Sequence, residues 1–283
     1  MTSINWYPGH MAKATRELKE QLKQIHLVIE VLDARIPYSS QNPNLEKVIS
    51  HKPRLIILNK KDLADVYKTQ AWITYFNQHS TRHAMAVNAF KKTDIKAIIS
   101  YCEAQLLRKS DASSGRQSFQ RLNVMIVGIP NVGKSQLINQ LANKKSAKVA
   151  NRPAVTQRQQ WVRLSPTVYL LDTPGVLWPK FESEKVGINL AVTGAIKDHV
   201  FDMEDVAFYL LRYLVKNYPT LLQRRFKLTS LPEDIVQLMM SIGKQRGCIE
   251  RGGAVDLDKT VKMLLHEYRS GKLGLITLEN HPS

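Results

Sequence analysis

Residues 128–135, GIPNVGKS, constrain the fold of this chain more than any other segment. They follow the apolar run NVMIV (123–127) and precede QLINQLA (136–142), which has the composition of a helix. A glycine-containing turn of this spacing between a buried strand and a helix is typical of a phosphate-binding loop. Its glycines let backbone N–H groups close around phosphates, and the helix directs the positive end of its dipole at them. The alternative is a chance match in an ordinary loop, which the flanking strand and helix disfavour.

The residues of this segment have separate expected roles at a nucleoside triphosphate. We expect Lys134 to reach the β and γ phosphates and to act in catalysis, and the Ser135 hydroxyl to bind a magnesium ion. The remaining contacts of this loop with the nucleotide are predicted to come from Gly128, Asn131, Val132, Gly133 and Gln136.

A second segment, DTPG (172–175), follows the predicted strand VYLL (168–171). There Asp172 can support the magnesium ion, usually through a water molecule, and the Gly175 N–H can face the γ phosphate. A simple Pro-Gly turn is the alternative for so short a motif. Between the two motifs, Thr156 is the candidate for a catalytic threonine that closes on magnesium and the γ phosphate, and this assignment rests on its position.

A third segment, NKKD (59–62), ends the strand-like run RLIIL (54–58). The Asp62 carboxylate can accept from both N1–H and the exocyclic amine of guanine, a donor pair that adenine lacks, so it would select GTP over ATP. We expect the Asn59 side chain to hold the loop in place and to approach guanine N7, while the aliphatic stem of Lys60 covers the face of the base. Alone, NKKD is also an ordinary polar turn. Together with the two phosphate motifs, it predicts guanine recognition.

A further segment, VNAF (87–90), is similar to the Ser-Ala type of segment that contacts guanine O6 through a backbone N–H. In this chain Ala89 would supply the N–H, and Asn88 stands in place of the serine. Both residues are therefore candidate guanine contacts.

The order of these motifs indicates a circular permutation. The guanine-reading segments precede the phosphate loop, whereas in the usual GTPase they follow it. The stretch RKSDASSGRQSFQR (108–121) has no apolar period, and we predict that it is the surface connection joining what are normally the two chain ends. The chain would then leave the GTPase domain just after DTPG, so the state of the nucleotide could act on whatever follows through a few covalent bonds.

Apolar runs and helical stretches alternate over the first 180 residues. Residues 11–25 have the spacing of an amphipathic helix, and helical stretches lie between several of the apolar runs. These runs, which are typical of buried parallel strands, are 27–32, 54–58, 84–87, 123–127 and 168–171. We therefore predict an α/β fold, a circularly permuted P-loop GTPase domain with a doubly wound, mainly parallel sheet, over residues 1–180.

After Trp178 and Pro179 the strand-like runs stop. Three amphipathic segments, 202–218, 232–247 and 257–271, predict a smaller all-α domain over residues 181–283. Pro232 and the two acids after it suit a helix start, while Gly247 and Gly271 suit helix ends.

A formal net charge of +17 favours a polyanionic partner, with nucleic acid ahead of an anionic membrane surface. The excess is uneven, because the first 181 residues hold 27 Lys and Arg against 11 Asp and Glu, whereas the remainder hold 14 against 13. Within that near-neutral remainder, residues 206–232 contain five basic side chains and no acid. Such a run is either a binding patch or a solvated helix face.

The two cysteines, Cys102 and Cys248, are far apart and have no metal-ligand spacing, so a reducing cytoplasm is expected. The amino terminus lacks the order of a secretory signal, and the apolar runs are too short to span a bilayer. We therefore expect no membrane segment.

From end to end, the chain resembles the circularly permuted ribosome biogenesis GTPase A family. The strings that carry the resemblance are WYPGHMAKA (6–14), DARIP (33–37), NKKD, GIPNVGKS, DTPGVLWPK (172–180) and TGAIKD (193–198). The resemblance implies GTP hydrolysis coupled to late maturation of the large ribosomal subunit, with binding to ribosomal RNA and precursor particles. It also implies that the helical domain contributes to that binding.

The resemblance also suggests what positions the attacking water. Val176 stands just past the glycine of DTPG, where many GTPases carry a glutamine. The family suggests that His10 of WYPGH moves to the γ phosphate instead, and a neutral imidazole can accept from water. The alternative is a histidine at a turn or helix start that packs on Trp6 and Tyr7, and these two aromatic side chains could also dock on RNA.

Asn131 resembles the asparagine of potassium-activated GTPases, in which a potassium ion takes the place of an arginine finger. A purely structural asparagine in the loop is the alternative. Magnesium, and potassium through Asn131, are therefore the expected ions.

The favoured function is a GTP-hydrolysing assembly factor, in which GTP orders the switch segments and hydrolysis releases the protein from its particle. Intrinsic turnover should be slow, because neither a glutamine nor an evident arginine finger is present, and ribosomal particles should accelerate it. The alternative is a GTP-regulated RNA-binding module without significant turnover. A signalling or membrane-trafficking GTPase is disfavoured by the charge and by the missing lipidation signals. We expect a cytoplasmic monomer that binds GTP or GDP.

Overall fold

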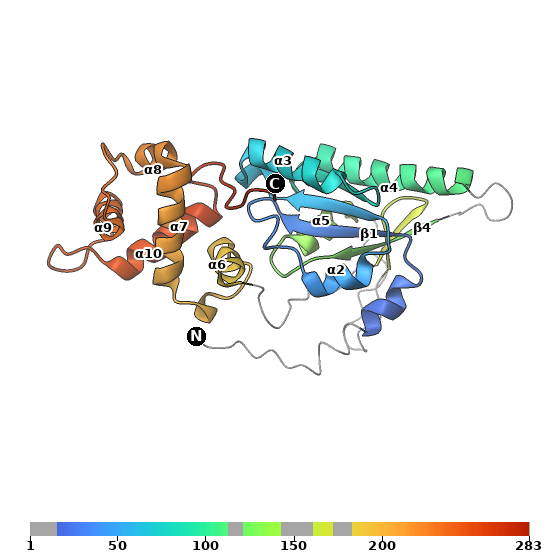
Figure 1. The fold of residues 1–283 in the computed structure, drawn as a ribbon, viewed down its shortest axis with the longest axis horizontal. Helices are drawn as coiled ribbons and strands as arrows, with labels where there is room; N and C mark the ends of the chain where they lie inside the picture. The colour runs from blue at the N-terminus through green and yellow to red at the C-terminus, as the bar shows by residue number, and fades with distance from the viewer. Residues whose placement is uncertain (1–15, 113–120, 143–160, 172–182, 283) are drawn as a thin grey trace.

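The computed structural model describes residues 16–112, 121–142, 161–171 and 183–282. An α/β part built around one sheet occupies one end of the molecule, and a group of helices occupies the other (Figure 1). The predicted boundary between residues 180 and 181 lies outside the described residues, so it stays a prediction.

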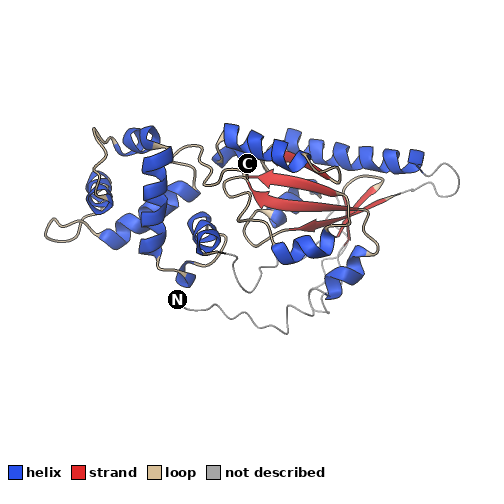
Figure 2. Cartoon of the chain, viewed as in Figure 1, coloured by secondary structure: helices blue, strands red, loops and turns tan. Residues whose placement is uncertain are grey.

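The strands of the described residues, drawn in red in Figure 2, gather in one sheet. It is six-stranded, in the order β3-β2-β1-β4-β6-β5. All neighbouring pairs are parallel except β5 with β6. The bounds are β1 Leu27–Asp33, β2 Arg54–Asn59, β3 Arg82–Val87, β4 Leu122–Val127, β5 Trp161–Arg163 and β6 Val168–Leu171. The five predicted strands are confirmed, and β3 begins two residues earlier than predicted. Sequence reasoning missed β5 because it is a three-residue edge strand with no apolar run.

Helices cover both faces of the sheet, as a doubly wound fold requires. One face packs on α4 (Lys92–Ala112) and α5 (Lys134–Leu141) through odd-numbered residues of β1 such as Ile29 and Val31. The even-numbered residues of β1 face the other way, where they pack on residues 16–22, α2 (Pro43–Ile49) and α3 (Val66–Asn77). The predicted alternation of strand and helix therefore produces two separate cores on one sheet.

Two predictions in this part need correction. Residues 108–112, expected in a loop, continue α4 to Ala112, because RKSDA contains neither Gly nor Pro to end the helix. Residues 113–120, the rest of that predicted connection, lie outside the described residues. Of the helix predicted over residues 11–25, the described portion is helical at 16–22 and turns at 23–24.

The second part is helical, and within the described residues it contributes no strand to the sheet. Its helices are α6 (Glu184–Thr193), α7 (Met203–Asn217), α8 (Pro219–Phe226), α9 (Ile235–Gln245) and α10 (Leu257–Arg269), with a short 3₁₀ turn, η2 (Asp198–Val200), between α6 and α7. A second 3₁₀ turn, η1 (Lys61–Leu63), follows β2 in the α/β part. The three predicted helices correspond to α7, α9 and α10. The Asp234 side chain caps α9, so Pro232 and Glu233 precede the helix, while Gly247 and Gly271 end helices with positive φ, as predicted.

The basic run at 206–232 lies on α7, α8 and the loop after α8. Arg225 forms an ion pair of 2.8 Å with Glu267 of α10, so part of the run holds helices together. Arg212, Lys216, Arg224 and Lys227 are exposed. The run is therefore partly structural and partly a solvated basic surface.

A strap formed by residues 276–279 carries the chain back onto the α/β part. The Ile276 N–H donates to the Leu63 carbonyl at 3.1 Å, and the Leu278 N–H donates to the Arg35 carbonyl at 2.8 Å. The buried Glu279 carboxylate accepts from the Tyr38 N–H at 2.7 Å and from the Asn189 amide of α6 at 2.9 Å. The strap thus ties the helical part to two loops at the carboxyl edge of the sheet. Of the helices in the described part of the chain, none is long and apolar enough to cross a membrane.

Candidate nucleotide-binding site

The predicted phosphate loop connects the end of β4 to the start of α5, as the sequence indicates. Three of its residues have positive φ: Gly128 (150°), Asn131 (60°) and Gly133 (98°). A Cβ atom at Gly128 would lie 2.5 Å from the Val31 carbonyl oxygen of the adjacent strand. Only glycine allows the loop to leave the sheet this closely against β1.

The start of α5 offers its N–H groups to an anion. Gly133 occupies the N-cap position and has no side chain that could accept from the first turn. The exposed Ser135 and the half-buried Gln136 lie in that turn. Uncapped N–H groups at a helix start, with the helix dipole behind them, are the arrangement that an anion site requires, and the anion site itself stays a prediction.

The Lys134 side chain lies folded over its own loop. It is 8% exposed, and its ammonium donates to the Ile129 carbonyl at 2.7 Å. The loop thus holds the lysine at its inner edge, next to the uncapped turn.

The segment predicted to read guanine lies directly against the phosphate loop. Asn59 ends β2, and its amide nitrogen donates to the Val132 carbonyl at 2.8 Å. Its amide oxygen is buried and has no hydrogen-bond partner among the described residues. A Cβ atom at Gly133 would collide with the same Asn59 amide. The structure therefore brings together NKKD and GIPNVGKS, which are about 70 positions apart in the chain.

Lys60 forms a second link between the two segments. Its backbone is left-handed, with φ 61°, and its ammonium donates to the Asn131 carbonyl at 2.8 Å and to Asp33 at 2.9 Å. Asp62 follows in η1 and is exposed, in agreement with a carboxylate that accepts from a ligand.

The VNAF segment reaches the same edge of the sheet. Val87 lies opposite Asn59 in the parallel pair of β2 and β3, so Asn88 and Ala89 follow at the edge that carries NKKD. The Asn88 side-chain oxygen accepts from the Phe90 N–H at 2.8 Å, and the backbone N–H of Asn88 donates to the Asp94 carboxylate at 2.7 Å. Asp94 also forms an ion pair with Lys61 at 2.7 Å. The Asn88 turn is thereby fixed beside the loop of Asp62.

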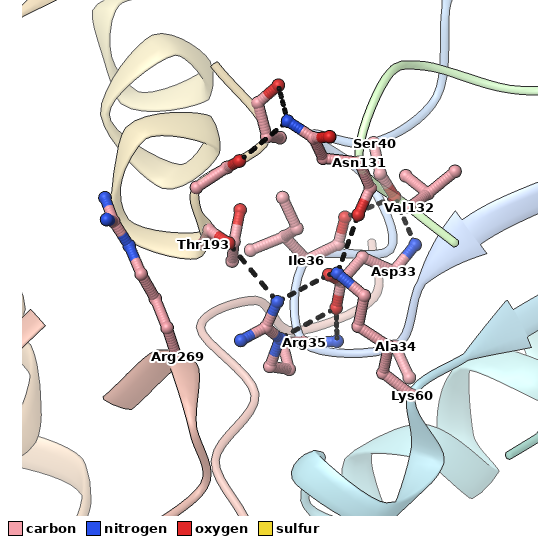
Figure 3. A network of polar contacts seen from close by, with 12 residues as sticks. Asp33, Ala34, Arg35, Ile36, Ser40, Lys60, Asn131, Val132, Thr193 and Arg269 are labelled. Carbon is pink, nitrogen blue, oxygen red and sulfur yellow. Dashed lines mark hydrogen bonds and ion pairs between the residues drawn. The ribbon is translucent and has the colours of Figure 1, made fainter. Parts of the chain in front are cut away.

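Sequence reasoning missed the network centred on Asp33, which ends β1 (Figure 3). The Asp33 carboxylate is buried and accepts from the Arg35 guanidinium at 2.7 and 2.9 Å, as well as from Lys60. Burial alone would raise the pKa of Asp33, but the Arg35 and Lys60 charges hold that pKa well below the usual aspartate range. The DARIP string entered only through the resemblance. The string directly follows β1, at the sheet edge that carries both loops, and this position is the signal that could have marked Asp33 as a site residue.

The network extends to the last turn of α6 (Figure 3). Arg35 donates to the Thr193 carbonyl at 3.4 Å, and the Asn131 amide donates to the Gly194 carbonyl at 3.1 Å. Arg269 of α10 donates to the two preceding carbonyls, those of Ala191 and Val192, at 2.7 and 3.0 Å. The C-terminal carbonyls of α6 are therefore satisfied by side chains, one of which belongs to the phosphate loop.

Several predicted site residues lie outside the described residues. These are His10, Thr156, Asp172 and Gly175. Their predicted roles stay predictions.

The fold and the site define a class: a P-loop GTPase with a circularly permuted chain order, in which the base-reading strand β2 precedes the phosphate-binding strand β4. The comparisons with known proteins agree. The family model described as 50S ribosome-binding GTPase matches residues 123–236. A protein of Bacillus cereus named ribosome biogenesis GTPase A is 50% identical over 98% of this chain and 93% of its own length. The chain belongs to the ribosome biogenesis GTPase A family.

More distant relatives cover a similar share of the chain. Mitochondrial ribosome-associated GTPase 1 of Mus musculus is 34% identical over 97% of this chain and 89% of its own. The crystal structure of GNP-bound YlqF from T. maritima superposes with a TM-score of 0.66 at 25% identity, covering 95% of this chain and 98% of that one.

The close approach of Gly133 to Asn59 yields a test. Gly133→Ala should lower GTP affinity by at least tenfold, because a methyl group there displaces the Asn59 amide and strains a left-handed residue by about 1–2 kcal/mol. Titration calorimetry with GTP measures the effect. Gly247→Ala is the matched control, since Gly247 also has positive φ (66°) but nothing lies within 4 Å of its Cβ position. Equal GTP affinity in both variants would contradict the proposed role of the Gly133–Asn59 contact.

Proposed function

We propose that this protein is a GTP-hydrolysing ribosome assembly factor that acts as a cytoplasmic monomer in late maturation of the large subunit. The observation that supports it best is the direct contact of NKKD with the phosphate loop, through Asn59 and Val132. Such a contact would let a base-reading loop and a phosphate loop act at the two ends of one nucleotide. The names of the relatives, which refer to ribosome biogenesis and to ribosome association, supply the partner.

The described residues suit the binding of GTP. We expect the N–H groups at the start of α5 to contact the phosphates, together with the Lys134 ammonium once it leaves the Ile129 carbonyl. We expect Asp62 to accept from the guanine edge, with the Ala89 N–H beside it. Asn59 and Lys60 position these two groups relative to each other, because each donates to a carbonyl of the phosphate loop. Binding GTP therefore uses loops that already touch.

Magnesium is the ion on which GTPases of this kind generally depend, and it neutralises charge on the β and γ phosphates when bound. The Ser135 hydroxyl, exposed in the first turn of α5, is an oxygen donor of the type that magnesium takes. We propose Thr156 and Asp172 as the other protein groups that hold it.

The nucleotide state can reach the helical part through described contacts. Asn131 of the phosphate loop and Arg35 beside Asp33 both donate to the end of α6. A shift of the phosphate loop on GTP binding or hydrolysis changes the cap of this helix. We propose that this coupling, together with the covalent path after DTPG, alters the affinity of the helical part for ribosomal particles.

The central test is co-sedimentation with ribosomal particles in the presence of GTP, GDP or a non-hydrolysable analogue, together with turnover assays. We expect binding that is stronger with the analogue than with GDP, and slow turnover that rises with added particles. Particle binding that depends on GTP but is accompanied by no GTP hydrolysis would instead establish an RNA-binding module regulated by GTP. Failure to bind particles in any nucleotide state would refute the assembly function.

His10 is the proposed group that orients the attacking water, since Val176 cannot do so. His10→Ala should reduce particle-stimulated turnover by roughly 10²–10⁴-fold, the usual contribution of a positioned acid-base group, and leave GTP affinity within about twofold. Steady-state hydrolysis and nucleotide titration measure the two quantities. His79→Ala, which removes an exposed histidine after α3, is the control and should retain both. Unchanged turnover in His10→Ala would end the assignment.

Asn131 is the proposed ligand for potassium. The Asn131 amide nitrogen donates to the Gly194 carbonyl, so the amide oxygen is the atom that we propose to bind the ion. We expect faster hydrolysis in potassium chloride than in sodium chloride, and loss of that difference in Asn131→Ala. Asn139→Ala, at an exposed position of α5, should keep it. Equal rates of the unchanged protein in the two salts would exclude the potassium ion.

A further inference from the structure

A basic cavity lies at the amino edge of the sheet, the edge opposite to the nucleotide site. Its volume is about 460 Å³, within the range of about 300–1,000 Å³ for sites that hold small ligands. The helical segment at 16–22 and the turn after it form one wall, and α2 and the turn before β2 form the other. The lining residues are Lys19, Leu22, Lys23, Lys47, Val48, His51 and Lys52.

The lining of this cavity, which we call the lysine pocket, is cationic without a matching acid. No Asp or Glu lines it, and Lys19 and Lys47 form no ion pair with any residue in the described ranges. Lys23 pairs with Glu20 at 2.6 Å, but both side chains are more than 60% exposed, so water screens the pair. Lys52 donates to the Ile25 carbonyl at 2.9 Å, which fixes its ammonium at the wall. Lys19 and Lys47 thus add positive charge that no acid in the described ranges pairs with.

Glu46 of α2 does not neutralise this charge. Its carboxylate pairs with Arg54 and with Arg82, the latter at 2.9 Å, on the side of α2 that faces β2 and β3. These two arginines satisfy it within the α/β part. Lys47, the exposed lysine of α2, is left for an external anion.

The pocket is remote from the nucleotide. Lys23 and Lys52 precede β1 and β2, whereas Asp33 and Asn59 end these strands, and a strand rises about 3.3 Å per residue. The seven residues of β1 therefore separate the two sites by roughly 20 Å. This exceeds the Debye length of about 10 Å at 0.1 M salt, so charge changes in the pocket leave GTP affinity almost unaffected.

We propose that the lysine pocket binds backbone phosphates of ribosomal RNA, which gives the GTPase part its own contact with the particle. This proposal rests on the proposed function, because it names a second attachment of the same assembly factor. The charge distribution supports it: the first 181 residues carry nearly all of the positive excess, whereas the helical remainder holds 14 basic against 13 acidic side chains. The resemblance implies that the helical part binds RNA, yet the helical part is not the part that carries the excess positive charge.

The shape of the site favours RNA over an anionic bilayer. A concave pocket with Leu22 and Val48 among its lining can enclose a phosphate and its ribose, with lysines around them. A helix that inserts into a membrane interface instead projects apolar side chains into the lipid, whereas lysines alone hold a protein only at the surface of an anionic bilayer. No large hydrophobic side chain among the described residues projects from this pocket: those that are exposed lie elsewhere, as at Tyr38, Tyr67 and Phe90.

The test uses the full chain and a charge-matched pair of variants. Lys19→Glu/Lys47→Glu reverses two charges at the pocket, and Lys92→Glu/Lys96→Glu makes the same change in net charge on α4, on the opposite face of the sheet. Binding to purified large ribosomal subunits and to deproteinised ribosomal RNA is measured with the GTP analogue across a salt series. We expect the pocket variant to lose at least tenfold in affinity at 0.1 M salt. Its slope of log affinity against log salt should fall by about one to two, since each phosphate contact contributes about 0.7–0.9.

The outcomes separate this proposal from the proposed function. If the unchanged protein binds subunits in a GTP-dependent way and the two variants bind equally well, the pocket proposal fails alone. If the unchanged protein does not bind subunits at all, the proposed function fails.

Loss of binding to phosphatidylglycerol vesicles by the pocket variant, with RNA binding retained, would overturn the RNA assignment in favour of lipid. Lys19→Gln/Lys47→Gln, which removes charge without adding acids, should show a smaller loss in the same direction. Both pocket variants, at Lys19 and Lys47, should retain GTP affinity within about twofold because of screening.

Discussion

The buried Asp33 carboxylate is the interaction on which the site depends. It holds Arg35 and Lys60 in place, and these two cations contact α6 and the phosphate loop respectively. Removing one partner of a buried ion pair costs about 3–5 kcal/mol, because the remaining charge stays buried without compensation. The three charges therefore act as one unit, and their arrangement fixes the distance between the base-reading loop, the phosphate loop and the helical part.

The topology of the sheet explains why two distant segments form one site. Parallel strands β1, β2 and β4 end at the same edge of the sheet, so the residues that follow them are brought together by the topology alone. The direct bonds from Asn59 and Lys60 to the phosphate loop then set the register of the two loops. Circular permutation preserves all of these contacts, because they depend on the order of strands in the sheet and not on their order in the chain.

The sequence predicted the strands and loops whose determinants are local. The apolar run before GIPNVGKS, and the Lys and Ser that close it, identify β4, its loop and α5 without any further information. It could not predict β5, whose three residues pair with β6 and show no pattern of their own. It also could not predict the contact of Arg35 with Thr193, which joins residues 158 positions apart, or that the chain past α10 returns to the sheet. Those features depend on how α6 and α10 pack, and a single sequence shows no such packing.

The strap has a consequence for the synthesis of the protein. Residues 276–279 anchor the backbone at Arg35 and Leu63, next to the residues predicted to contact the guanine ring, yet they are translated after every strand of the sheet. The exit tunnel still encloses this segment when the sheet has already emerged and begun to fold. A nascent chain can therefore assemble its phosphate loop early, but its base-reading loops become fully pinned only after residues 276–279 have left the ribosome that makes them.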